Sequence, residues 1–281
     1  MKNLLLAFAL STTLSPAWGQ NSNTQTIPAF TRTTYDDVRV AELQEQVQLD
    51  FSYLINVSIS STEVTSNATV TQSDNMAILQ TSANANERAT LRSKRPIRHF
   101  SGRDSTALFG ALFTAGVDNS TQTAGVGDQD DVDGLYFGYN GTAFGVLHLK
   151  NSVATWVPQA SWNGDDTLDG SGDCSALDPT KLNHYEISYR IPGRARFYIE
   201  CQETGRFTLV HDLLYQNQNT TPFFKDHILY LLARSENHAN TSNLTVKVSE
   251  MGGYVDGKFD DFQVTVENVI LEEGRGVLVL Q

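Results

Sequence analysis

Large apolar and aromatic side chains alternate with polar ones over several short stretches of this chain. Across residues 47–59 an apolar or aromatic residue stands at every second position, and residues 184–191 show the same alternation through Tyr185, Ile187 and Tyr189. A period of two places such residues on one face of a β-strand. The pattern therefore predicts strands with one buried face at both stretches.

A hairpin is predicted near the middle of the chain. Residues 135–139 and 142–149 are rich in aromatic residues and glycine, and they flank Asn140-Gly141. Asn-Gly supplies the two positive φ angles that a type I′ turn requires. Further strands are predicted around Val64 and Val70 and over 76–79, 195–200, 207–211, 228–233, 244–248 and 262–271.

Helical patterns are scarce. Only residues 37–46 have the character of a short helix, and no stretch combines helical periodicity with capping signals over three turns. Short strands separated by Gly, Asn and Asp turns instead predict an all-β protein. The expected architecture is a β-sandwich or jelly roll of the concanavalin-like or a related type.

The start of the chain has the order of a secretory signal peptide. Lys2 precedes the apolar run 4–10, and Ala17-Trp18-Gly19 forms a small-residue cleavage site. An uncleaved anchor is the alternative, although the run is far shorter than the ~20 residues of a spanning helix, and no later segment is apolar enough to cross a bilayer. We expect a secreted or virion-surface protein with a signal peptide (1–19), a polar arm (20–37), a β-sandwich domain (38–258) and a C-terminal strand segment (259–281).

Asn-x-Ser/Thr sequons and one cysteine pair fit an exported protein. Seven sequons are candidate glycosylation sites in a eukaryotic secretory route, although a chain rich in Asn, Ser and Thr also forms them by chance. Cys174 and Cys201 fit no zinc motif and are expected to form a disulfide, with two buried thiols as the alternative. The sequons are at Asn56, Asn67, Asn119, Asn140, Asn219, Asn240 and Asn243.

The net charge of -12 gives no electrostatic support for binding nucleic acid. Against this acidic background, residues 92–103 hold five of the twenty Lys and Arg residues. Such a segment either contacts an anionic partner or glycan, or is an exposed strand whose charges prevent edge-to-edge pairing.

Clustered carboxylates form a candidate calcium site. Asp128, Asp130, Asp131 and Asp133 resemble part of an EF-hand loop, but Tyr139 and Asn140 stand where the closing glutamate would be. A solvated acidic turn is the favoured alternative, and otherwise no cofactor is expected. A second acidic run in a Gly-rich loop contains Asp165, Asp166, Asp169 and Asp173.

Aromatic residues beside polar groups are candidates for stacking on sugars. Tyr136, Tyr139, Trp156 and Trp162 are of this kind, with a place in the sandwich core as the alternative for each. Trp162 precedes a polar loop and is expected to be the exposed one. The predicted ligand-binding set is Trp162, Asn163, Asp165 and Tyr139.

No catalytic apparatus is recognisable. The six histidines are scattered, and no serine lies in a Gly-x-Ser-x-Gly elbow. Glycoside hydrolysis needs two placed carboxylates, one with a raised pKa, and no Asp or Glu stands in a context that singles it out. We therefore expect a protein that is not an enzyme.

One long segment and several shorter ones carry a family resemblance. The segment 134–148, Gly-Leu-Tyr-Phe-Gly-Tyr-Asn-Gly-Thr-Ala-Phe-Gly-Val-Leu-His, resembles an uncharacterised family of virion-associated or surface proteins found in large DNA viruses of eukaryotes and in marine phages. This resemblance implies a β-sandwich of virion-structural or attachment type and brings no active site with it. The signal peptide and the cysteine pair depart from the family pattern. The shorter matching segments are 70–76, 111–117, 119–122, 161–165, 168–172, 177–181 and 204–211.

These observations predict a non-enzymatic structural or attachment protein of a virion or exported surface. Its expected partners are other virion or surface proteins, host glycans and further copies of itself. A secreted lectin-like carbohydrate-binding module is the alternative, and a glycoside hydrolase is a third and weaker one.

Overall fold

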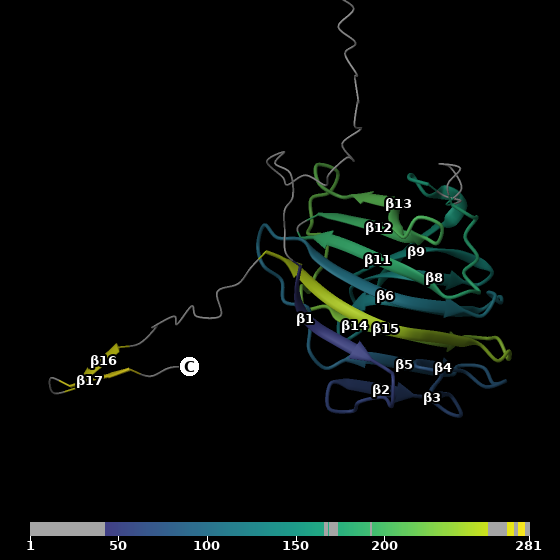
Figure 1. The fold of residues 1–281 in the computed structure, drawn as a ribbon, viewed down its shortest axis with the longest axis horizontal. Coiled ribbons are helices and arrows are strands. Elements are labelled where there is room, and N and C mark those ends of the chain that lie inside the picture. The colour runs from purple at the N-terminus through teal and green to yellow at the C-terminus, as the bar shows by residue number, and fades with distance from the viewer. Residues whose placement is uncertain are drawn as a thin grey trace, which may run out of the picture. The chain divides into compact units, whose positions relative to one another are not determined.

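The structure is a computed structural model that describes residues 43–165, 168, 174–191 and 193–257, together with two strands at 269–272 and 275–278. It confirms the predicted β-sandwich, because two large antiparallel sheets lie face to face (Figure 1). Within these residues the one helical element is the short 3-10 turn η1 (Gln159–Ser161). No helix among them is long and apolar enough to span a bilayer.

The first sheet has eight strands, and β1 (Leu43–Asp50) lies outside their linear order and pairs with β15. The long strand β15 pairs with β4 through its first residues, and β1 pairs with β15 from Glu250 to Asp256. The order of the other strands is β13 (Arg206–Leu214), β12 (Arg194–Cys201), β11 (Asn183–Arg190), β6 (Ser105–Phe113), β15 (Thr245–Asp256), β4 (Met76–Gln80) and β3 (Thr69–Ser73).

The second sheet has seven strands, and a separate hairpin follows the sandwich in sequence. β16 (Val269–Glu272) pairs with β17 (Arg275–Leu278), so the strand predicted over 262–271 is confirmed from 269 onward. Residues 262–268, the signal peptide and the polar arm lie outside the described residues. The order of the seven strands is β10 (Val153–Pro158), β9 (Ala143–Lys150), β8 (Gly134–Asn140), β7 (Ser120–Gly127), β14 (Tyr230–Asn237), β5 (Arg88–Ser93) and β2 (Ser60–Val64).

The predicted central hairpin is present, but its turn is shifted by one residue. Asn140 pairs with Ala143, so Gly141 and Thr142 form the turn. Gly141 has a φ of 59°, and neither Asn140 nor Thr142 has a positive φ. A positive φ at the first turn position alone is what a type II′ turn requires, whereas type I′ would need two.

The alternation over 47–59 does not form one long strand. β1 ends at Asp50, whose carboxylate accepts hydrogen bonds from the backbone N–H and hydroxyl of Ser52 at 2.9 and 2.6 Å. This local hydrogen bonding favours a turn over a continued strand. Residues 51–59 then cross to the other sheet, and the helix expected over 37–46 is wrong from Leu43 onward because β1 occupies those residues.

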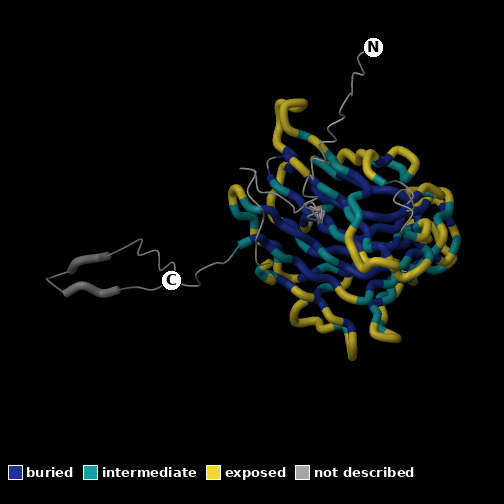
Figure 2. Tube along the Cα trace, turned by 45° about the horizontal axis from the view of Figure 1, so that its top comes forward, coloured by how far each residue is buried: buried dark blue, intermediate teal, exposed yellow. Residues whose placement is uncertain are grey.

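The buried residues lie along the strands of the two sheets (Figure 2), and aromatic side chains contribute much of the core between them. The ring of Phe137 on β8 lies 4.8 Å from that of Tyr185 on β11 and 5.3 Å from that of Phe197 on β12. All three side chains are fully buried. Burial of such rings is among the largest stabilising contributions available to a sandwich.

The predicted disulfide is confirmed. Cys174 and Cys201 are bonded, with their Cα atoms 5.5 Å apart and a sequence separation of 27. The bond ties the segment before β11 to the end of β12. By loop entropy it contributes about 3 to 4 kcal/mol to stability.

The buried carboxylate of Glu87, just before β5, links two loops by hydrogen bonds. It accepts hydrogen bonds from the backbone N–H groups of Ser82 and Asn67 at 2.6 and 3.0 Å and from the Asn84 amide at 3.0 Å. Burial raises the pKa of Glu87, but the hydrogen bonds from Ser82, Asn84 and Asn67 outweigh it and lower the pKa from 4.5 to about 2.

Stability should therefore fall in acid through Glu87. Because its folded-state pKa is the lower one, its contribution is present above pH 4.5 and is lost as the pH falls toward 2. We expect Glu87→Gln to cost about 1 to 3 kcal/mol at pH 7, since it leaves buried donors unpaired, and to flatten stability over that pH range. Urea unfolding at several pH values measures both effects. The same curve for Glu87→Gln and wild type would contradict this role, and Glu63→Gln, on an exposed side chain, is the control.

Candidate ligand-binding site

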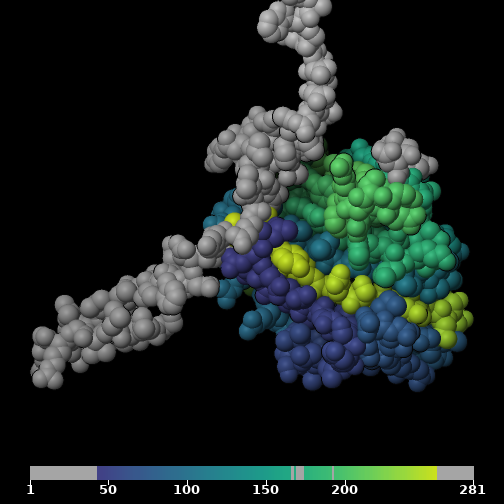
Figure 3. Space-filling model, in the orientation of Figure 1, coloured from purple at the N-terminus to yellow at the C-terminus, as the bar shows by residue number. Residues whose placement is uncertain are grey.

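A pocket opens between β1 and the crossing loop 51–59. Its volume is about 740 Å³, within the range of small-molecule and saccharide sites. In the space-filling view this part of the surface lies beside the strip formed by β15 (Figure 3). The lining residues are Glu45, Gln46, Val47, Gln48, Asp50, Ser52, Tyr53, Leu54, Asn56, Ser58, Ile59 and Arg95.

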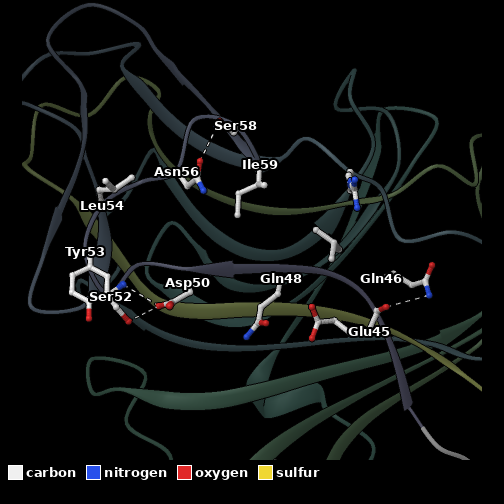
Figure 4. Close-up of a pocket in the computed structure, with 12 residues that line it drawn as sticks. Glu45, Gln46, Gln48, Asp50, Ser52, Tyr53, Leu54, Asn56, Ser58 and Ile59 are labelled. Atoms are coloured by element: carbon white, nitrogen blue, oxygen red, sulfur yellow. Dashed lines mark hydrogen bonds between the residues drawn. The ribbon is translucent and has the colours of Figure 1, made fainter.

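Strand alternation explains which side chains of β1 remain available to a ligand. Val47 and Leu49 are buried in the core, and Gln48 and Asp50 point away from it. Gln48 pairs with Gly252 of β15, which has no side chain to cover it. Gln48 and Asp50 are among the lining residues, and Figure 4 shows their side chains on the side of β1 that points away from Asn56 and Ile59.

The crossing loop forms the opposite side of the pocket. The backbone carbonyl of Asn56 accepts hydrogen bonds from the N–H groups of Ile59 and Ser60 at 3.1 and 3.0 Å, which fixes the turn there. Asn56 and Ile59 face β1 across the pocket (Figure 4). Lys94 donates from its ammonium to the carbonyl of Val57, and its backbone N–H bonds to Ile59.

Exposed apolar side chains gather at this loop. Tyr53 is 91% exposed, and of the eleven exposed large hydrophobics among the described residues four lie within 53–59: Tyr53, Leu54, Val57 and Ile59. A cluster of this kind marks an interaction surface. An aromatic ring with an apolar face and a polar hydroxyl suits a ligand of the same mixed character.

The polar lining supplies both donors and acceptors. The amides of Gln46, Gln48 and Asn56 and the hydroxyls of Ser52 and Ser58 can each do both. The hydroxyl and the backbone N–H of Ser52 lower the pKa of Asp50, so this carboxylate is an ionised acceptor at neutral pH. An aromatic ring beside such groups matches a polyhydroxylated ligand.

The same electrostatics disfavour Asp50 as the acid of a glycoside hydrolase. A glycoside hydrolase needs a carboxylic acid with a raised pKa beside a second carboxylate. The pKa of Asp50 is shifted in the opposite direction. Glu45 is the other carboxylate of the lining, so the lowered pKa argues only against Asp50 as the acid.

The residues predicted to bind a ligand lie elsewhere, and the expectation that Trp162 is exposed is wrong. Trp162 and Tyr139 are 7% and 9% exposed and belong to the core. The Trp162 ring packs 6.1 Å from Phe137, and its indole N–H donates to the carbonyl of Val157. Core packing outcompetes solvent exposure here because the residue faces the space between the sheets.

The polar neighbours of Trp162 organise their own loop. The Asn163 side chain exchanges hydrogen bonds with the backbone of Asp212, donating at 2.8 Å and accepting at 2.7 Å. The carboxylate of Asp165 accepts from the backbone N–H of Leu168. Asp166, Asp169 and Asp173 lie outside the described residues.

The acidic turn 128–133 engages protein donors. The buried carboxylate of Asp133 accepts from the backbone N–H groups of Asn151, Lys225 and Asp226 at 2.9, 2.9 and 2.7 Å. Asp131 forms ion pairs with Arg88 and Arg234.

The other two carboxylates of the turn, Asp128 and Asp130, differ in their burial. Asp128 accepts from the N–H of Val132, and burial raises its pKa; Asp130 is exposed. Among the described residues, the one group of three His, Cys, Asp or Glu close enough to hold a metal is Cys174, Cys201 and Glu203, and both cysteines are in the disulfide. The structure thus does not bring three of the four turn carboxylates together.

The basic segment 92–103 is distributed over several contacts. Arg92 pairs with Glu63 at 3.1 Å and lies over the ring of Tyr230. Arg103 donates to the carbonyl of Asp256. Arg95 lines the pocket and is its one cationic side chain.

Six of the seven sequon asparagines are exposed. Asn240 is 8% exposed, and its amide donates to Asn237 at 3.1 Å while accepting from the N–H of Ser242. The amide nitrogen of Asn240 is therefore engaged within the fold. The exposed ones are Asn56, Asn67, Asn119, Asn140, Asn219 and Asn243.

Comparison with known proteins defines the fold and no family. No family model matches the chain, and no curated protein matches it. Solved structures are similar at low identity. One is described in connection with endo-acting O-glycanases that prominent members of the human gut microbiota express to initiate mucin breakdown. Its TM-score is 0.52 at 11% identity, and the match covers 75% of this chain and 99% of that one.

Two further similar structures have other described roles. One is the CBM2 module of an evolved Dit protein of Lactobacillus casei BL23 phage J-1 (TM-score 0.51, 9% identity, 78% and 99% coverage). The other is described as an immunostimulatory antigen and pseudo β-1,3-glucanase of Mycobacterium tuberculosis (TM-score 0.51, 8% identity, 76% and 99% coverage). The chain is therefore a β-sandwich of the type found in glycanases and carbohydrate-binding modules.

Proposed function

We propose that this protein is a non-enzymatic attachment protein of a virion or exported surface, and that it binds carbohydrate in the pocket beside β1. The observation that carries the proposal is the pairing of Tyr53, 91% exposed at the pocket, with a lining of amides, hydroxyls and the carboxylates of Glu45 and Asp50. Stacking on an aromatic ring and hydrogen bonding to planar polar groups are what a sugar requires.

Two further considerations support the proposal. The fold occurs in a carbohydrate-binding module and in a protein described as a pseudo β-1,3-glucanase, so this architecture is compatible with binding without turnover. The lowered pKa of Asp50 disfavours this residue as a general acid. Attachment through a glycan is the part of the expected virion or surface role that the pocket supports.

Binding to immobilised oligosaccharides tests the proposal. We expect the full chain to bind at least one member of a panel of linear β-1,3-glucan oligosaccharides and mucin-type O-glycans, without releasing new reducing ends. Tyr53→Ala should weaken that binding about tenfold, which corresponds to ~1.4 kcal/mol of lost stacking. Biolayer interferometry gives the affinities.

Phe207→Ala is the matched control, because Phe207 is an exposed aromatic residue on β13 and does not line the pocket. It should bind like wild type. Equal affinity of wild type and Tyr53→Ala for the bound saccharide would exclude this pocket. Release of shortened products by wild type would show that the protein is an enzyme.

A further inference from the structure

We infer that Asn56 is an N-glycosylation site whose glycan occupies the pocket and blocks external saccharides. The blocking of external saccharides rests on the proposed function, whereas the modification of Asn56 is argued from its geometry. Asn56 belongs to the sequon Asn56-Val57-Ser58. Both Asn56 and Ser58 line the pocket.

The side chain of Asn56 is held ready for modification. Its Oδ1 accepts a hydrogen bond from the backbone N–H of Ser58 at 2.9 Å, which orients the amide. Its Nδ2 donates to no acceptor among the described residues, and it points into the space between the loop and β1 (Figure 4). The residue is exposed, so a transferase can reach the nitrogen.

The other sequons lack this combination. The amide of Asn240 is buried and bonded to Asn237, and Nδ2 of Asn219 donates to the carbonyl of Tyr215 at 3.0 Å. Of the seven sequon asparagines, Asn56 is the one that lines the 740 Å³ pocket. A glycan at any of the others does not begin inside it.

Glycosylation of Asn56 places a permanent competitor in the pocket. In the secretory route a lipid-linked diphospho-oligosaccharide donates its sugar, so that a bond forms between Nδ2 and the anomeric carbon, the lipid diphosphate leaves and the amide loses one proton. The first sugars then lie in the pocket that Tyr53 and β1 line. A tethered ligand acts at a high effective concentration, of millimolar order for a short tether.

The test compares three forms of the full chain made in secreting eukaryotic cells: wild type, Ser58→Ala, which removes this sequon but keeps Asn56, and Thr69→Ala, which removes the sequon at Asn67 away from the pocket. Each form made without glycosylation is its own reference, so that any contribution of the Ser58 hydroxyl to binding cancels. Glycopeptide mass spectrometry gives occupancy, and the β-1,3-glucan and mucin O-glycan panel gives binding. Nitration of Tyr53 by tetranitromethane reports how accessible the pocket is.

We expect Asn56 to be occupied, and glycosylation to weaken binding to the panel at least tenfold in wild type and Thr69→Ala but to leave the binding of Ser58→Ala unchanged, each form being compared with itself made without glycosylation. Glycosylation should likewise slow Tyr53 nitration in wild type and Thr69→Ala and not in Ser58→Ala. An unoccupied Asn56, or equal nitration with and without its glycan, would overturn the inference. Failure of unglycosylated wild type to bind any saccharide, with Tyr53 still shielded by the Asn56 glycan, would instead overturn the proposed function and leave the glycan's position established.

Discussion

Replacing Asp133 by alanine should lower the free energy of unfolding by about 3 to 5 kcal/mol, because it leaves buried backbone donors without their charged acceptor. The side chain is fully buried and ties its own turn to two other segments: Asn151 in the turn after β9, and Lys225 and Asp226 before β14. Two-state urea unfolding, followed by tryptophan fluorescence, measures the change.

Asp130→Ala is the matched control from the same turn. Asp130 is exposed, so its replacement should change stability by less than about 0.5 kcal/mol. Similar unfolding midpoints for the two variants would contradict the structural role of Asp133. If added Ca²⁺ stabilised wild type and this stabilisation disappeared in Asp130→Ala, the turn would be a calcium site after all.

Trp162→Ala should cost about 3 to 5 kcal/mol, the usual range for removing a buried aromatic side chain. The ring packs against Phe137 and Phe144 in the core, and its N–H loses the bond to Val157. Thermal unfolding by circular dichroism measures the loss. A stable Trp162→Ala variant that no longer binds saccharide would restore the interpretation of Trp162 as a ligand-binding residue.

Tyr53→Ala provides the opposite pattern. Its side chain is 91% exposed, so stability should stay within about 0.5 kcal/mol of wild type while binding falls. The two aromatic residues therefore separate folding from binding in one experiment.

The sandwich could be predicted from sequence because its signals are local. Alternation over 184–191 predicted the strand that became β11, and glycine at a two-residue turn marked the central hairpin. The exact turn type was missed, since Asn140 remained in the strand and Gly141 alone took the positive φ.

Burial across the two sheets was harder to predict. Trp162 precedes a polar loop in sequence, yet its ring lies against β8 and β9 in space. The acidic turn shows the same limit: the partners of Asp131 are Arg88 and Arg234, 43 and 103 residues away. Spacing along the sequence does not reveal such distant partners. A turn whose carboxylates contact protein donors therefore resembled a metal-binding loop.

The pocket was missed because alternation over 47–59 indicated a single strand with Tyr53 on its buried face. The available signal was Asp50-Phe51-Ser52, in which an aspartate can bond to the residue two positions on and end a strand. Recognising that turn would have separated the inward residues of β1 from the exposed loop, although not the volume between them.

Mapping a bound saccharide onto the chain by NMR tests the central claim most directly. Titration of the unglycosylated protein with a β-1,3-glucan or mucin-type oligosaccharide that it binds should shift backbone amide resonances within 45–59 and at Arg95, and leave the saccharide intact. Shifts centred on another surface, such as the outer face of the eight-stranded sheet around His184, or progressive conversion of the saccharide to shorter products, would contradict the account.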